Sequence, residues 1–212
     1  MAAREGRESL PFSADEVRAA YARAQGEVGP YVTIVVATKY VSPDELAVLV
    51  EAGLETVGEN RLQDLEAKHE RYGDAFRWHF IGHLQSRKAR DVSDLTELVH
   101  SLDSVSAAKR LSVPALVEVN LSGEETKSGV APGDLGAFLR DVREAGVDVR
   151  GLMTMPPLAD DPEESRPYFR RLRELAQEHE LAELSMGTSQ DYRVAAEEGA
   201  TFVRIGSRLF GR

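Results

Sequence analysis

Lys39 is the residue of this chain best suited to covalent chemistry. It directly follows the apolar run 32–38, which predicts a buried strand, and a turn with a helix start comes after it. Lysine is rarely buried without a partner, so this placement favours a chemical role. A desolvated amine can be neutral and can attack an aldehyde to form a Schiff base. For Lys39 taken alone, the alternative is an exposed lysine that simply ends a strand.

Two loops rich in glycine and serine predict a phosphate site. One contains Ser189 and follows the seventh predicted strand, and the other contains Gly206 and Ser207 and follows the eighth. Glycine allows close backbone approach, and free N–H groups with hydroxyls can bind an oxyanion. Such residues also occur in ordinary turns. Two such loops, adjacent in the expected fold, favour the phosphate site.

Arg204 interrupts the apolar run 201–205 and is therefore expected to point toward the mouth of the fold. A guanidinium cannot lose its proton, so beside a pyridine ring it would keep the ring nitrogen unprotonated. The alternative is a structural pair with a carboxylate such as Glu118. An amine, a phosphate cradle and a guanidinium together suit pyridoxal 5′-phosphate (PLP), which has an aldehyde, a phosphate and a ring nitrogen.

The elements that must position these residues alternate between strands and helices. Strands are predicted at 32–38, 56–59, 77–82, 98–102, 115–121, 150–154, 183–186 and 202–205. Eight such units predict an α/β fold, a single (β/α)8 TIM barrel with its site at the carboxyl ends of the strands. An open doubly wound sheet is the alternative, but the sequence lacks its Gly-x-Gly-x-x-Gly fingerprint.

Smaller features complete the expected architecture. Residues 1–12 are expected to form a flexible tail, and residues 13–212 a single barrel domain. An extra helix at 13–25 is expected to cover the bottom of the barrel. The helix at 106–111 must be short, because few residues separate its flanking strands. In the helix at 168–179, the apolar positions Tyr168, Leu172, Leu175, Ala176 and His179 are predicted to share one face.

Composition excludes several classes of function. The chain has no cysteine, so disulfides, thiolate catalysis and cysteine-bound metals are excluded, and no metal site is predicted. The formal net charge of −10 argues against non-specific nucleic-acid binding. No apolar run is long enough to span a membrane, and the first residues do not resemble a signal peptide. We therefore expect a cytoplasmic protein, and we separately expect it to be a monomer.

Ordered motifs throughout the chain resemble those of the pyridoxal phosphate homeostasis proteins, relatives of the N-terminal barrel of alanine racemase. The matching segments are 36–39, 57–63, 78–85, 99–104, 119–124, 127–129, 151–155, 185–192 and 203–211. The sequence departs from the family pattern at Thr188, where methionine is usual, and at Arg87, where asparagine is usual. The short helix after Asp103 is a further departure.

The resemblance implies a role for eight residues. Lys39 matches the lysine that forms the Schiff base with PLP. Ser189, Gly206 and Ser207 match phosphate-binding positions, and Arg204 matches the arginine that faces the pyridine nitrogen. The remaining matches line the cofactor pocket, and they are Asn60, His83 and Met186.

The resemblance also implies the function. We expect a protein that holds PLP, acts in its intracellular homeostasis and hands it to apo-enzymes, with little or no catalysis. The alternatives are a PLP-dependent amino-acid racemase and a barrel that binds a phosphorylated sugar or aldehyde as class I aldolases do. A racemase needs bases on both faces of the substrate, and alanine racemase takes one from a second domain. The chain ends at Arg212, so the carrier is favoured.

Overall fold

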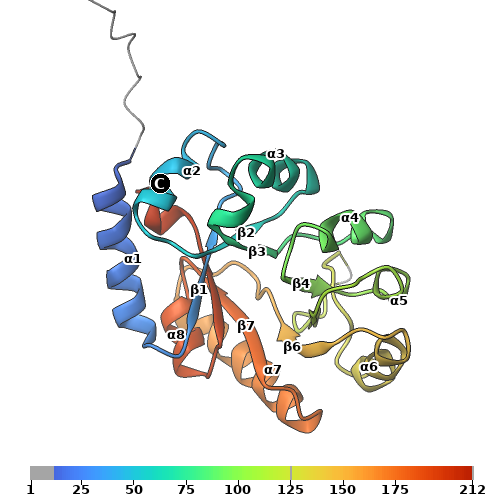
Figure 1. Cartoon of the computed structure of the whole chain (residues 1–212). Coiled ribbons are helices and arrows are strands. Elements are labelled where there is room, and N and C mark those ends of the chain that lie inside the picture. Colours follow the sequence, from blue (N-terminus) through green and yellow to red (C-terminus); the bar gives the residue numbers. More distant parts are fainter. Residues whose placement is uncertain (1–11, 125, 212) are drawn as a thin grey trace, which may run out of the picture.

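Eight parallel strands close into a barrel in the computed structural model, which describes residues 12–124 and 126–211. Each strand pairs with the next along the chain, and β1 also pairs with β8 to close the barrel. The predicted (β/α)8 barrel is therefore confirmed (Figure 1). The strands are β1 Thr33–Ala37, β2 Thr56–Glu59, β3 Arg77–Phe80, β4 Leu98–Leu102, β5 Ala115–Glu118, β6 Val149–Met153, β7 Glu183–Thr188 and β8 Phe202–Ile205.

Helices surround the strands, as Figure 1 shows. The α-helices between strands are α2 Leu46–Glu51, α3 Leu62–Tyr72, α4 Ala89–Ser93, α5 Val105–Ala108, α6 Leu135–Glu144, α7 Arg166–Glu178 and α8 Tyr192–Glu197. Short 3-10 turns are η1 Gly73–Ala75, η2 Ser86–Lys88, η3 Pro162–Ser165 and η4 Ser207–Leu209. The helix expected to be short, α5, is a single turn. Among the described residues, no helix is long and apolar enough to cross a membrane.

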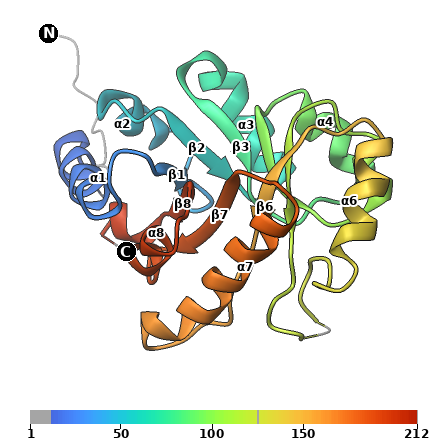
Figure 2. The ribbon, with the colours of Figure 1, turned by 90° about the horizontal axis from the view of Figure 1, so that it is seen from below.

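The N-terminal helix α1 (Ala14–Val28) begins at Ser13, which forms a reciprocal capping box with Glu16. This extra helix was expected at the bottom of the barrel, and that expectation is wrong. It packs against α2, α8 and η4, in the outer ring of helices (Figures 1 and 2). The reason is topological. Only the short η4 follows β8 in the described residues, so α1 fills the place of the missing eighth outer helix. The expected tail, 1–12, lies outside the described residues except for Phe12.

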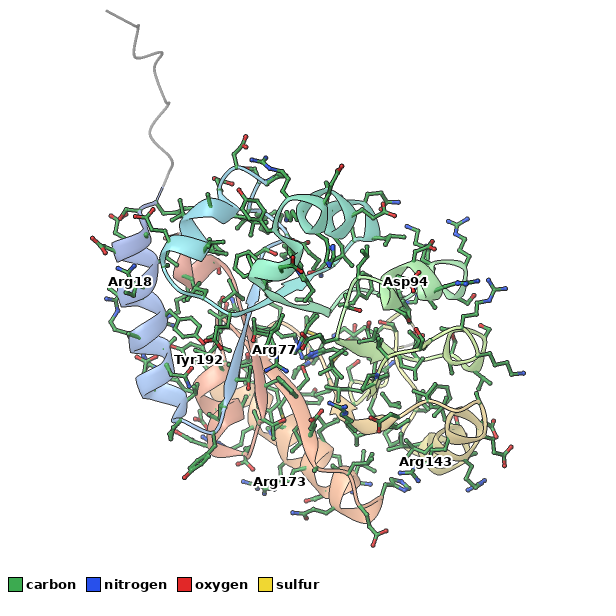
Figure 3. The ribbon with its side chains drawn as sticks, in the orientation of Figure 1. Arg18, Arg77, Asp94, Arg143, Arg173 and Tyr192 are labelled. Carbon is green, nitrogen blue, oxygen red and sulfur yellow. The ribbon has the colours of Figure 1, made fainter. Side chains whose placement is uncertain are left out.

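Contacts between α1 and α8 attach the N-terminal helix to the barrel. Tyr192 lies between α1 and the barrel wall (Figure 3), and its hydroxyl donates to the Glu27 carboxylate of α1. Arg193 forms an ion pair with the same carboxylate. Arg18, Arg143 and Arg173 project from the outside of the helical ring in the same view. These contacts hold α8 against α1.

The core has two parts. The larger lies between the strands and the helices, where α7 contributes Phe169, Leu172, Leu175 and Ala176. Phe169, not the half-buried Tyr168, takes the first position on this buried face, and His179 ends the helix. The smaller part fills the inside of the barrel with Leu98, Leu116, Met153 and Phe202.

Polar residues occupy the next layer inside the barrel. Side chains on a strand alternate between its two faces. Two residues beyond Leu98 and Phe202 are therefore His100 and Arg204, which point into the same interior and are buried. Between them lies Ser185 of β7, which hydrogen-bonds to both. A polar layer thus separates the apolar bottom of the barrel from its carboxyl-end mouth.

Candidate functional site

A cavity of about 350 Å³ opens at the carboxyl ends of the strands. The residues that line it come from the ends of six strands and from η4, and they are Ala37, Lys39, Tyr40, Asn60, Ile81, Met155, Thr188, Ser189, Gln190, Arg204, Gly206, Ser207 and Phe210. The cavity therefore brings together six of the eight residues predicted to bind the cofactor.

Lys39 stands at the mouth of this cavity and is exposed. Burial was expected to desolvate its amine, and that expectation is wrong. Strand β1 ends at Ala37, so the chain has already left the sheet when it reaches Lys39. The amine lies 4.8 Å from the centre of the Tyr40 ring, a cation–π contact. The Lys39 amine is thus accessible to a ligand in the cavity.

A buried ion pair lies directly behind Lys39. Lys68 of α3 pairs with Glu59 of β2, and both side chains are almost completely buried. The Lys68 amine also donates to the carbonyl oxygen of Thr38 at 2.8 Å, and the Thr38 hydroxyl donates to Glu59. The backbone just before Lys39 is therefore fixed by two charged side chains. The burial of Lys68 was not predicted. Its spacing from Leu62 and Leu65, which places all three on one face of α3, was the available signal.

The two predicted phosphate loops are joined by a hydrogen bond. The N–H of Gly206 donates to the hydroxyl of Ser189 at 3.2 Å. Gly206 is required here, because a Cβ at this position would lie 2.9 Å from the carbonyl oxygen of Ala37. The carboxylate of Asp191 accepts from both the N–H and the hydroxyl of Thr188. The loops after β7 and β8 are thus preformed around one end of the cavity.

Arg204 reaches the cavity from inside the barrel. Its guanidinium donates to the Ser185 hydroxyl, to the carbonyl oxygen of Thr154 at 3.0 Å and to the Met155 sulfur at 3.0 Å. Burial lowers the pKa of Arg204 to about 10, which leaves it charged at neutral pH. Glu118, the alternative partner, accepts a hydrogen bond from Ser128 and forms no ion pair with Arg204 in the described structure.

The other three predicted residues differ in their placement. Asn60 lines the cavity, and its buried Oδ1 atom has no hydrogen-bond partner among the described residues. His83 is exposed, with Nδ1 3.7 Å from the carboxylate of Asp103, and it does not line the cavity. Met186 is fully buried between the barrel and the helices, because it points to the opposite side of β7 from Ser185.

Seven lining residues were not predicted as site residues, and they are Ala37, Tyr40, Ile81, Met155, Thr188, Gln190 and Phe210. Tyr40 is the neighbour of Lys39, and Met155 comes two residues after β6, so strand-end position was an available signal for both. Phe210 packs against Phe12, with ring centres 5.0 Å apart, and this contact comes from a distant part of the sequence. No local pattern predicts it.

Buried polar atoms support the fit of a polar, anionic ligand to this cavity. A buried polar atom without a partner is costly, so Asn60 Oδ1 is available to accept a hydrogen bond from a ligand. Arg204 supplies a buried cation, and the two loops supply hydroxyls. Lys39 supplies the amine. The cavity therefore has hydrogen-bond donors at two places and an amine at its mouth.

Comparisons with known proteins show the family to which the chain belongs. The sequence model of the alanine racemase N-terminal domain family matches residues 13–212. The pyridoxal phosphate homeostasis protein of Aquifex aeolicus is 44% identical over 192 residues, which cover 82% of this chain and 84% of the relative. The corresponding protein of Deinococcus radiodurans is 39% identical over 211 residues, which cover 95% and 99%.

Solved structures give the same result. PipY of Synechococcus elongatus with PLP bound superposes with a TM-score of 0.83 at 32% identity, covering 92% of this chain and all of PipY. A lysine/ornithine decarboxylase of Vibrio vulnificus, at 17% identity and a TM-score of 0.70, shares the fold alone.

The closed barrel and the family match together place the chain in the alanine racemase N-terminal domain class of (β/α)8 barrels. Within that class, the chain belongs to the family of pyridoxal phosphate homeostasis proteins.

Proposed function

We propose that this protein binds PLP in the cavity as a Schiff base on Lys39 and acts in intracellular PLP homeostasis, with little or no catalysis. The observation that carries the proposal is the convergence of Lys39, Arg204 and the two phosphate loops on one cavity of about 350 Å³. The naming of the relatives and the PLP-bound structure of PipY support the same ligand.

The proposed roles follow from the placement of the residues. Lys39 is accessible and close to the loops, so it is the candidate for covalent attachment. Ser189, Gly206 and Ser207 lie where the phosphate would be held, and Arg204 would face the ring nitrogen from inside the barrel. Asn60, through its unpaired atom, would bond to a polar group of the ring. The placement of His83 and Met186 gives neither of them a direct role.

Arg204 is the reason to expect little turnover. When bound, PLP supplies an aldehyde that exchanges Schiff bases and a ring that stabilises carbanions best when its nitrogen is protonated. A guanidinium that remains charged at this position disfavours ring protonation and so weakens carbanion chemistry. Schiff-base exchange needs no ring protonation, so binding and release are unaffected. A carrier requires only these two steps.

The proposal includes a cellular setting. We place the protein in the cytoplasm as a monomer, with PLP-dependent apo-enzymes as acceptors. The names of the relatives support the homeostasis role, from which PLP-dependent acceptors follow. Size-exclusion chromatography with light scattering measures the oligomeric state, and a mass near twice 23.3 kDa would contradict the monomer.

The test of binding uses absorbance and peptide mapping. Added PLP is expected to give a visible absorption band, borohydride is expected to fix the ligand, and the adduct is expected on Lys39. Lys39→Ala is expected to lose the band. Lys88→Ala is the matched control, since Lys88 lies in η2 outside the cavity, and it is expected to behave like the original protein. An adduct on Lys88 or Lys127 would contradict the assignment.

The test of function separates a carrier from an enzyme. The PLP-loaded protein is expected to activate an apo-enzyme while leaving a panel of L-amino acids unchanged in chirality and composition. Turnover of any of these amino acids that is abolished by Lys39→Ala would replace the carrier by a racemase or another PLP enzyme.

A further inference from the structure

A chain of hydrogen bonds crosses the inside of the barrel and ends on Arg204. His79 of β3 and His100 of β4 are joined by a hydrogen bond between Nδ1 of His79 and Nε2 of His100, 3.0 Å apart. Nδ1 of His100 lies 2.8 Å from the hydroxyl oxygen of Ser185. The same hydroxyl contacts the guanidinium of Arg204. Four strands therefore contribute to one continuous contact chain, from β3 through β4 and β7 to β8.

The chemistry of Arg204 sets the direction of this chain. A guanidinium can only donate, so the Ser185 oxygen accepts from Arg204. Ser185 is completely buried, and His100 Nδ1 is the remaining contact of its hydroxyl among the described residues. The Ser185 proton therefore goes to His100 Nδ1. In the reverse direction this proton would have no acceptor, at the full cost of a buried unpaired donor.

The direction determines the tautomer of both histidines. Because Nδ1 of His100 accepts, its proton is on Nε2 and is donated to Nδ1 of His79. His79 then carries its proton on Nε2. Such an assignment needs both rings to be neutral, and burial lowers the pKa of His79 to about 4 and that of His100 well below its usual value. The positive charge of Arg204 lowers the pKa of His100 further.

Packing keeps the rings in place. The two imidazoles lie 5.1 Å apart between centres, and Phe202 meets them edge-on at 5.8 Å and 5.2 Å. Both histidines are 3% exposed or less. Buried polar groups of this kind stabilise a single arrangement only when every member is bonded.

We propose that Ser185, His100 and His79 are positioning residues that hold Arg204 in the cavity through a hydrogen-bonded chain of one fixed direction. Three of the five N–H donors of Arg204 have acceptors in the protein. The hydrogen-bonded chain holds one of these donors, at Nη1, and thereby fixes the orientation of the guanidinium at the cavity. The effect on PLP rests on the proposed function, whereas the tautomers belong to the protein alone.

The first test measures the tautomers in the ligand-free protein. Protein labelled with ¹⁵N at histidine has five imidazoles, and long-range ¹H–¹⁵N spectra at pH 7 distinguish Nδ1–H from Nε2–H. Variants His79→Gln and His100→Gln assign the two signals. We expect both histidines to carry the proton on Nε2. A proton on Nδ1 of His100 would overturn the proposal, whatever the ligand of the cavity proves to be.

The second test measures the consequence for the ligand. Ser185→Ala removes one of the three acceptors of Arg204, and we expect PLP affinity to fall about tenfold or more, since hydrogen bonds to charged groups are the strong ones. Ser185→Thr retains the hydroxyl and is expected to restore most of the affinity. Ser93→Ala is the matched control, because it removes a buried hydroxyl on α4 that bonds to Ala89.

Thermal unfolding separates positioning from general damage. We expect Ser185→Ala and Ser93→Ala to lower the melting temperature by similar amounts, with only Ser185→Ala changing the PLP absorption band and its affinity. Equal PLP affinity in Ser185→Ala and the original protein would overturn the positioning role. So would an equal loss of affinity in Ser93→Ala.

Discussion

Lys39 and Arg204 bring two cations to one cavity, but the protein holds them differently. Lys39 is exposed, and its amine lies over the Tyr40 ring, so the amine is accessible to a ligand. Arg204 is buried and donates to three acceptors, so its position is set before any ligand arrives. The exposed amine suits covalent exchange, and the buried guanidinium suits orientation of a ligand. This division agrees with a protein that takes up and releases its ligand.

The phosphate loops give a prediction at the scale of single residues. We expect Ser189→Ala or Ser207→Ala to weaken PLP binding by about 10- to 100-fold, because each hydrogen bond to an anion contributes about 1.5–3 kcal/mol. Binding of unphosphorylated pyridoxal is expected to change much less. Absorbance titration with both ligands measures the difference.

The control for this prediction is Ser106→Ala, an exposed serine on α5 that lies outside the cavity. It is expected to leave both affinities unchanged. If Ser189→Ala weakened PLP and pyridoxal equally, the phosphate role of this loop would be refuted.

At the scale of elements, the ion pair of Glu59 and Lys68 fixes α3 to the barrel. Lys68 also bonds to the backbone carbonyl of Thr38, next to the cavity. Removing one member of a buried ion pair leaves the other charge unpaired and costs about 3–5 kcal/mol, whereas replacing both by apolar residues is often neutral. We therefore expect Lys68→Met to be strongly destabilised. The double variant Glu59→Leu with Lys68→Met is expected to recover most of that stability.

Urea unfolding of both variants measures these free energies. The exposed pair of Arg77 and Glu97 is the matched control, and Glu97→Gln is expected to cost less than about 1 kcal/mol. Because the double variant no longer fixes the carbonyl of Thr38, we expect it to fold yet to attach PLP more weakly. A double variant as unstable as Lys68→Met would contradict this prediction, because the loss of stability would then not arise from an unpaired buried charge.

The N-terminal helix shows how one element completes another. Glu27 of α1 accepts from Tyr192 and Arg193 of α8, and Phe12 packs on Phe210 of the cavity wall. The segment before the first strand thus supports the rim formed by the last strand. This closure joins the two ends of the described chain at the functional face.

For the whole molecule, the buried histidines make stability depend on pH. Burial lowers the pKa of His79 from 6.5 to about 4, so the unfolded chain takes up a proton before the folded one does. The stability is fully present above pH 6.5 and is lost as the pH falls toward 4. For this residue the loss is about 3 kcal/mol at most. His100 acts in the same direction.

Urea unfolding between pH 7.5 and 4.5 checks this expectation. The free energy of unfolding is expected to fall less steeply in His79→Gln than in the original protein. Burial raises the pKa of Glu118 and of Asp103, which acts in the opposite direction, but both proteins share these groups. Identical slopes would mean that His79 is already protonated, or exposed, in the folded protein.

Much of the architecture was predictable from the sequence, because it depends on local patterns. All eight strands lie within one or two residues of their predicted starts, since apolar runs between polar turns are local signals. Gly53, Gly146 and Gly199 end their helices with positive φ angles, as glycine allows. The strand ends carrying Lys39, Ser189 and Arg204 were identifiable for the same reason.

The tertiary structure decided which side chains meet. Ser185 and Met186 are neighbours in sequence, yet Ser185 points into the barrel and Met186 points into the helical layer. Successive strand residues face opposite sides, so the register of the closed barrel makes this choice, and the local sequence does not. The exposure of Lys39, the burial of Lys68 and the histidine chain arise in the same way. They depend on distances between segments far apart in the chain, which only closure of the barrel establishes.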